Sequence, residues 1–173
     1  MVLKLFACVV MLSACLGTQP PLRLGTATPI AVVIQLESAA GKGIGVPRAV
    51  VAGLEQELRA RDLVPTWVDA ASLGDARTSA ERITLLSAAS DAPWVMLVEA
   101  RARFFSQLSG RYRWDVELRT SLVQRGQDPQ VSDLSVAAFL SFEHEREAEA
   151  LAFVRRQLED DVTTLVDRVM RER

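Results

Sequence analysis

The segment WVMLVEARARFFSQLSGRYRWDVELRTSLVQ, residues 94–124, alternates apolar and polar side chains on both sides of the turn QLSGR. A period of two predicts strands that bury one face, and the turn between them predicts an antiparallel hairpin. With Gln107 opposite Arg111, the polar faces form three oppositely charged pairs, Arg103–Asp115, Arg101–Glu117 and Glu99–Arg119. A shift of two residues in one direction brings like charges together, so the charge pattern selects this register.

Further strands and helices are predicted on both sides of this hairpin. β-branched residues and alternation predict strands, and a period of 3.6 predicts helices. The expected strands lie at 30–38, 63–70 and 134–142, and the expected helices at 47–62, 79–90 and 145–171. The order β-α-β-α-β-β-β-α predicts a single α/β (α+β) domain. Its mixed sheet has about five strands, an antiparallel C-terminal meander and a long C-terminal helix after it.

Local signals refine three of these elements. Pro65 cannot donate to a strand ladder, so the strand 63–70 is expected at a sheet edge. Thr78 and Glu81 have the spacing of a capping box, which predicts the start of the helix 79–90. The apolar residues of this helix are Ile83, Leu85 and Leu86.

The N-terminus MVLKLFACVVMLSAC has one charge at Lys4, an apolar run over residues 5–12 and then small residues. This pattern predicts an export signal, because a membrane-spanning helix needs about 20 apolar residues. A buried first helix is the alternative, but the following GTQPP does not continue a helix.

The residues Leu12-Ser13-Ala14-Cys15 resemble the lipobox of bacterial lipoproteins. The resemblance implies that residues 1–14 are a cleaved signal peptide and that Cys15 carries lipid. Residues 15–29 then form a tether, and residues 30–173 form the periplasmic domain. Leu16, where inner-membrane lipoproteins tend to have Asp, implies an outer-membrane anchor facing the periplasm. Cys8 leaves with the signal, so no disulfide is expected.

The composition narrows the classes of partner. The net charge of −2 gives no case for nucleic acid as a partner. Asparagine is absent, and arginine supplies nearly all of the positive charge.

The order of the segments also resembles a group of periplasmic lipoprotein domains. The matching pieces are IAVVIQLES, LEQELRARDL, VPTWVDAASL, SAASDAPWVMLVEARARF and WDVELRTSLVQRGQ. They resemble the penicillin-binding-protein activators of the LpoB type, the curli-secretion lipoproteins and the N-terminal domain of TolB. This resemblance implies a non-catalytic accessory subunit of an envelope assembly or transport system, with an envelope protein as partner. The long final helix and the short tether depart from that group. The helix is similar to that of auxiliary lipoproteins of lipid-transport systems, which implies the alternative of a lipid or glycolipid carrier.

Motifs for catalysis or cofactor binding are incomplete. The stretch GKGIG, residues 41–45, lacks the Ser or Thr of a P-loop, so we interpret it as a flexible connection, with anion binding before the next helix as the alternative. His144 is the only histidine, and we interpret it as a surface residue rather than a metal ligand. No G-x-S-x-G motif is present, and no feature selects a carboxylate pair for glycan cleavage. We therefore expect a protein that is not an enzyme and has no cofactor or metal.

Arginine is dense on the predicted hairpin, with six arginines against three acids between residues 99 and 125. One interpretation is a solvated face with ion pairs across the strands. The other is a partner-binding face for an envelope protein, a lipid headgroup or a glycan carboxylate, with an exposed aromatic side chain at its centre. The residues expected in this candidate partner face are Arg101, Arg103, Phe105, Arg113 and Arg119.

Overall fold

The computed structural model describes residues 27–39, 41–108, 110–141 and 147–172. Cys15, the predicted tether before residue 27 and His144 lie outside these residues. Among the described residues, no helix is long and apolar enough to span a membrane.

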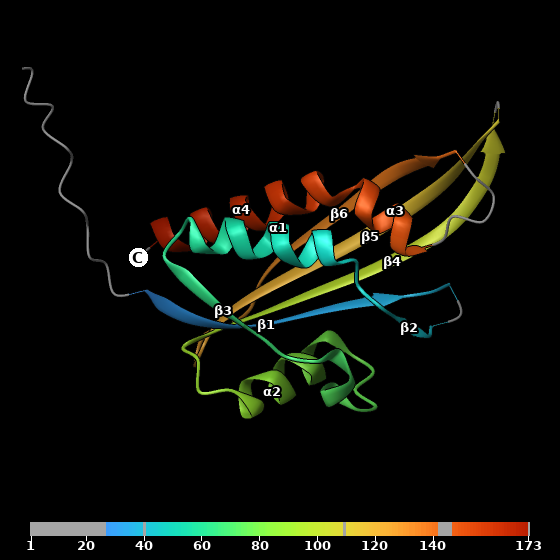
Figure 1. The fold of residues 1–173 in the computed structure, drawn as a ribbon. Coiled ribbons are helices and arrows are strands. Elements are labelled where there is room, and N and C mark those ends of the chain that lie inside the picture. The colour runs from blue at the N-terminus through green and yellow to red at the C-terminus, as the bar shows by residue number, and fades with distance from the viewer. Residues whose placement is uncertain (1–26, 40, 109, 142–146, 173) are drawn as a thin grey trace, which may run out of the picture.

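The described chain forms a single α+β domain (Figure 1). Its strands are β1 (Thr28–Glu37), β2 (Gly43–Ile44), β3 (Leu63–Trp67), β4 (Trp94–Leu108), β5 (Arg111–Gln124) and β6 (Gln130–Leu140). Its helices are α1 (Arg48–Arg59), the 3-10 helix η1 (Ala70–Leu73), α2 (Ser79–Ala89), α3 (Glu147–Phe153) and α4 (Arg155–Arg171). The predicted fold class and order of elements are confirmed.

The structure adds three local features to the predicted order. Part of the stretch predicted as a flexible connection forms β2, which pairs with the end of β1. The end of the segment predicted as a strand over 63–70 turns into η1, because Asp69 accepts a hydrogen bond from the backbone N–H of Ala71 and so begins a helical turn. The predicted C-terminal helix is divided into α3 and α4 at Val154.

The strands of the sheet follow the order β2-β1-β4-β5-β6, and β3 pairs with the first half of β1, whereas β2 pairs with its last two residues. β1 is parallel to β3 and β4, whereas β4, β5 and β6 form an antiparallel meander. β3 lies at an edge, as Pro65 predicts. Helices α1, α3 and α4 lie on one face of the sheet, and η1 and α2 lie on the other (Figure 1).

The register predicted for the central hairpin is confirmed over most of its length. Arg103 is opposite Asp115, and the other two predicted charge pairs also face each other. The prediction fails only near the turn, where Gln107 pairs with Tyr112 instead of Arg111. A β-bulge between Phe104 and Ser106 adds Phe105 to one strand and so shifts the pairing by one residue.

Two hydrophobic clusters form the core, one on each face of the sheet. The larger one packs alternate residues of β1, β4, β5 and β6 against α1, α3 and α4. The smaller one packs the other face of β1 and β4 against η1 and α2, and it ends at Leu97. Phe104 continues the alternation of the buried face of β4, but its side chain is 52% exposed. It packs instead against Trp114, with ring centroids 5.7 Å apart.

Helix α2 begins as predicted, and its apolar residues differ in burial. The Thr78 side chain accepts a hydrogen bond from the Glu81 backbone N–H, and the Glu81 carboxylate accepts one from the Thr78 backbone N–H, which completes the capping box. Leu86 is fully buried, whereas Leu85 is 43% exposed. Adjacent positions on a helix lie about 100° apart, so Leu86 faces the sheet and Leu85 does not.

Leu86→Ala and Leu85→Ala test this orientation of α2. We expect Leu86→Ala to lower the free energy of unfolding by about 2–5 kcal/mol, because it removes fully buried methyl groups and leaves a cavity. Leu85→Ala is the matched control on the adjacent position and should change it by less than about 0.5 kcal/mol. Urea unfolding of the two variants measures the difference, and equal losses would contradict the orientation.

Candidate functional site: a charged groove on the open face of the sheet

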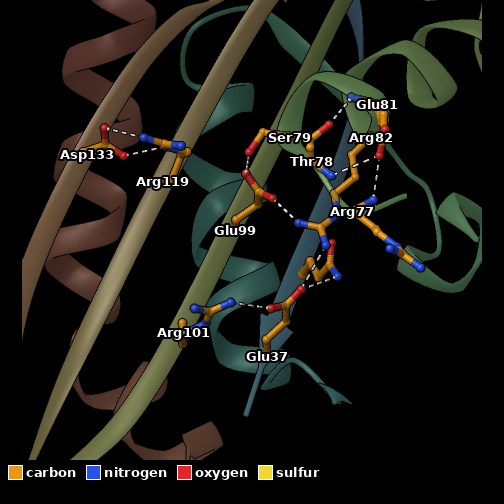
Figure 2. A network of polar contacts seen from close by, with 11 residues as sticks. Glu37, Arg77, Thr78, Ser79, Glu81, Arg82, Glu99, Arg101, Arg119 and Asp133 are labelled. Atoms are coloured by element: carbon orange, nitrogen blue, oxygen red, sulfur yellow. Dashed lines mark hydrogen bonds and ion pairs between the residues drawn. The ribbon is translucent and has the colours of Figure 1, made fainter. Parts of the chain in front are cut away.

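The face of the sheet that carries α2 is covered over only part of its length. Beyond the smaller hydrophobic cluster, the side chains on this face of β1 and β4 change from apolar to polar or charged, beginning at Gln35 and Glu99. The N-terminus of α2 and the uncovered strands enclose an open groove of about 650 Å³. Figure 2 shows the polar side chains that line it.

Arg82 of α2 is the centre of the polar contacts in the groove (Figure 2). Its guanidinium forms ion pairs with Glu99 of β4 and with Glu37 of β1, the latter at 3.1 Å. The three side chains are only 14–16% exposed. Charge-assisted hydrogen bonds of this kind are strengthened by partial exclusion of water, so Arg82 fixes α2 across two strands.

Each of the two glutamates has a further donor. Ser79 Oγ donates to Glu99 Oε2 at 2.5 Å. Arg101 Nη2 donates to Glu37 Oε2 at 3.0 Å, and Gln35 Nε2 donates to Glu37 Oε1 at 2.9 Å. The other amide atom, Gln35 Oε1, is buried and has no hydrogen-bond partner among the described residues. The carboxylates of Glu37 and Glu99 therefore both accept hydrogen bonds from arginine and from neutral side chains.

The first turn of α2 forms one rim of the groove. Glu81 Oε2 accepts hydrogen bonds from the backbone N–H groups of Arg77 at 2.7 Å and of Thr78 at 3.1 Å. The hydrogen bond from the Arg77 backbone N–H, followed by the one from Thr78, holds the pKa of Glu81 below its ordinary value. The Arg77 side chain is exposed at this rim.

An exposed ion pair forms the opposite rim. Arg119 of β5 donates to both carboxylate oxygens of Asp133 of β6, at 2.7 and 3.0 Å. The hydrogen bond from Arg119 lowers the pKa of Asp133, and the same contact raises the pKa of Arg119. Both side chains are more than half exposed, so solvent screens this pair and it contributes little to stability.

The structure brings the predicted face together in two parts. Arg101 and Arg119 lie in the groove, whereas the other three residues lie further along the hairpin. There the bulge places Phe105, which is 62% exposed, beneath the Arg113 guanidinium, 4.5 Å from its ring centroid. This is the geometry of a cation–π contact.

The three predicted charge pairs face each other across the hairpin, but the side chains form their ion pairs with other carboxylates. The arginines pair as Arg101–Glu37, Arg103–Glu117, Arg113–Asp115 and Arg119–Asp133. Arginine side chains are long enough to reach diagonal or third-strand carboxylates, and the neighbouring strands β1 and β6 supply Glu37 and Asp133. The face is consequently a network of paired charges and is less basic than residues 99–125 alone predict.

Arg82, Glu37 and Ser79 were not expected from the sequence to line a groove. A signal for Glu37 does exist, because the strand IAVVIQLE is apolar on both faces until Gln35 and Glu37 interrupt one of them. That change marks the point where the cover of this face ends. Arg82 and Ser79 carry no comparable signal, because an amphipathic helix presents several polar residues with equal periodicity.

Neither a metal centre nor a phosphate loop is assembled in the described part of the chain. No group of three or more His, Cys, Asp or Glu residues could hold a metal ion there. Within GKGIG, Gly43 and Ile44 are paired with Glu37 and Leu36 of β1. The groove presents arginine side chains as hydrogen-bond donors and carboxylates as acceptors, both placed on the strands of the sheet and on α2.

The domain is structurally similar to bacterial lipoproteins, and no family model or curated protein matches its sequence. Lipoprotein GNA1162 from Neisseria meningitidis is 12% identical with a TM-score of 0.44, and the match covers 79% of this chain and 99% of that chain. PelC from Paraburkholderia phytofirmans, a dodecamer, is 14% identical with a TM-score of 0.39 over 79% of this chain and 89% of that chain. Rare lipoprotein B from Shewanella oneidensis is 11% identical with a TM-score of 0.29 over 81% and 92%. Similarity at this level concerns the chain path and assigns no function.

Arg82→Met tests the central role of Arg82 in the groove. We expect it to lower the free energy of unfolding by about 2–4 kcal/mol, because two poorly exposed carboxylates lose their shared cation. Arg59→Met is the matched control, since Arg59 pairs with Glu55 on the solvent side of α1 and should contribute less than about 1 kcal/mol. Denaturant unfolding at neutral pH compares them, and equal effects would show that Arg82 is an ordinary surface arginine.

Proposed function

We propose that this chain is a lipid-anchored envelope lipoprotein that acts as a non-catalytic binding subunit of an assembly or transport system. The observation that carries the binding role is the open half of the sheet, where charged side chains stand on rigid strands without a covering helix. Sites on a rigid sheet keep their geometry, which favours recognition of a folded partner.

The anchoring part of the proposal rests on the lipobox at Leu12-Ser13-Ala14-Cys15. In this proposal residues 1–14 are removed, Cys15 carries lipid, and the chain is held at the outer membrane facing the periplasm. The described structure begins its first strand at Thr28. The part of the predicted tether before this strand, residues 15–27, spans at most about 45 Å, which keeps the domain and its partner close to the membrane.

The packing favours a binding subunit over the alternative of a lipid carrier. A carrier needs space for acyl chains between the sheet and the helices. That space is filled by large side chains from both layers, all less than about 2% exposed, among them Trp94, Met96, Leu151 and Leu158. The paired state of Glu37 and Glu99 likewise favours binding over acid–base catalysis, because arginine donors occupy both carboxylates.

The candidate partner face comprises Arg101, Arg103, Phe105, Arg113 and Arg119 in this proposal. Its apolar centre is Phe105, and its four arginines are anchored by carboxylates of their own chain. Arginines held in this way are already ordered, so less side-chain entropy is lost when a partner binds. Exposed aromatic side chains and arginines are the residue types that dominate binding energy in protein interfaces.

Cys15→Ser tests the anchor. The full-length variant should persist as an uncleaved precursor and incorporate no labelled palmitate, because the acylated sulfur is missing. Cys8→Ser is the matched control within the same segment and should be processed and labelled like the wild-type chain. Metabolic labelling and gel mobility measure both properties, and label retained by the Cys15→Ser chain would refute lipidation at this residue.

Reversing Arg103 and Arg113 together to Glu tests the partner face. The double variant should lose the crosslinked complexes that the anchored wild-type chain forms in intact cells. The fold should survive, since exposed ion pairs contribute about 1 kcal/mol or less each. Arg59→Glu with Arg171→Glu is the matched control on the helices. If crosslinking in the hairpin variant equals that of the wild type while circular dichroism is unchanged, the face is not the binding surface.

A further inference from the structure

The two edges of the sheet differ in how they are protected. One edge is built from the two-residue strand β2 and the five-residue strand β3, which contains Pro65. The other edge is the eleven-residue strand β6, and no strand of the described residues pairs with its outer side. Proteins normally protect long edge strands with proline, lysine, bulges or covering segments.

β6 has none of the usual protective residues. Its sequence QVSDLSVAAFL contains no proline, glycine or lysine, and its one charge, Asp133, is held by Arg119 of its own sheet. It also exposes two large apolar side chains, Val131 at 41% and Phe139 at 38%. An edge with these properties is suited to pairing with another strand.

The two exposed apolar residues of β6 lie at equal distances from Ser135. Val131 and Phe139 lie four residues on either side of it, Asp133 and Ala137 two residues, and Leu134 and Val136 one residue. We propose that two copies of this chain pair antiparallel through β6, with Ser135 opposite Ser135 of the second copy. In this register the two exposed apolar residues meet each other, and each Asp133 meets an alanine.

Neighbouring registers are less favourable. Centring the pair on Val136 places Phe139 opposite Asp133, and centring it on Leu134 places Phe139 opposite Pro129, outside the strand. Centring it on Asp133 places like charges opposite each other, which destabilises a strand pair. The register centred on Ser135 avoids all three arrangements.

The helix layer permits this pairing. Asp161 of α4 accepts hydrogen bonds from Thr120 Oγ1 at 3.2 Å and from Ser132 Oγ at 2.5 Å. Thr120 and Ser132 are direct partners on β5 and β6, so α4 lies above the gap between these strands. The gap is one strand spacing from the dimer axis, so the two Asp161 positions would be offset sideways by about 9.6 Å and along the strands by about six residues. The sideways offset is within the distance at which helices pack, about 8–10 Å.

Gln157 and Thr164 of α4, one turn on either side of Asp161, are exposed and uncharged. The Asp161 carboxylate between them accepts hydrogen bonds from Thr120 and Ser132 of its own sheet. The resulting dimer joins the two sheets into one, and it sets the charged grooves of the two copies on the same face.

Ser135→Cys in the full-length chain tests the proposed register within the cell envelope. Residues directly opposite in antiparallel strands have Cα atoms about 4.5 or 5.5 Å apart, and either distance permits a disulfide. Mild oxidation should therefore convert most of the variant into a disulfide-linked dimer that reductant dissolves. The wild-type chain, treated identically, measures any background from Cys8 and Cys15.

Val131→Cys is the matched control, because two copies of residue 131 would be separated by eight strand positions, about 27 Å. It should form no dimer alone, but it should crosslink to a differently tagged chain that carries Phe139→Cys. The proposal is overturned if Ser135→Cys gives no dimer, if Val131→Cys alone dimerises equally, or if Ser135→Cys crosslinks to a different protein instead.

A second measurement does not depend on cysteine. The detergent-solubilised wild-type chain should have the mass of a dimer in light scattering. Ser135→Lys should be monomeric, because two lysines would face each other across the axis. Its fold should be preserved, since Glu117 is the direct partner of residue 135 on β5. Ser135→Asn should remain dimeric, and a monomeric wild-type chain would overturn the proposal.

Discussion

The structure depends on a difference in length: β4 extends beyond the helix layer that covers one of its faces. β4 has fifteen residues, and its first half is buried on both faces. Beyond Leu97 the apolar cover on one face ends, and the strand continues with Glu99, which is held by Arg82 of α2, and then with the exposed Arg101 and Arg103. Burial of apolar area holds the first half in place, so the second half is a rigid extension. The groove, the bulge at Phe105 and the exposed aromatic residues all lie on that extension or beside it.

Arg82 lies where the apolar cover gives way to the charged face. Placing a guanidinium and two carboxylates in a poorly exposed position costs desolvation energy, and the mutual attraction offsets that cost only with good geometry. The contacts of Arg82 with Glu37 and Glu99 meet this condition and connect α2 to two parallel strands. A hydrophobic contact at the same place would hold α2 against the sheet but would not fix its orientation. The ion pairs also orient the side chains that line the groove.

The charged face and the unprotected edge are separate features of the same meander. β5 carries Arg113 and Arg119 toward the open face, whereas β6 ends the sheet and contributes Asp133 to that face. A partner bound on the face would contact the arginine side chains, whereas a second copy paired along β6 would contact backbone groups and the side chains of Val131 and Phe139. Asp133 belongs to both, because it holds Arg119 and lies in the edge strand.

By itself the sequence determined the fold class, the order of the elements, the capping box at Thr78 and the register of the central hairpin. These follow from local periodicity and from charge pairs between strands that a short turn connects. Only the tertiary structure decided that Leu85 is exposed, that α3 and α4 separate, and that Arg82 joins Glu37 and Glu99. Glu37 is 45 positions from Arg82 and Glu99 is 17, so their contacts depend on how helix and sheet pack. No periodicity records a contact of that kind, because many pairings of polar residues are compatible with the same pattern, and packing selects one.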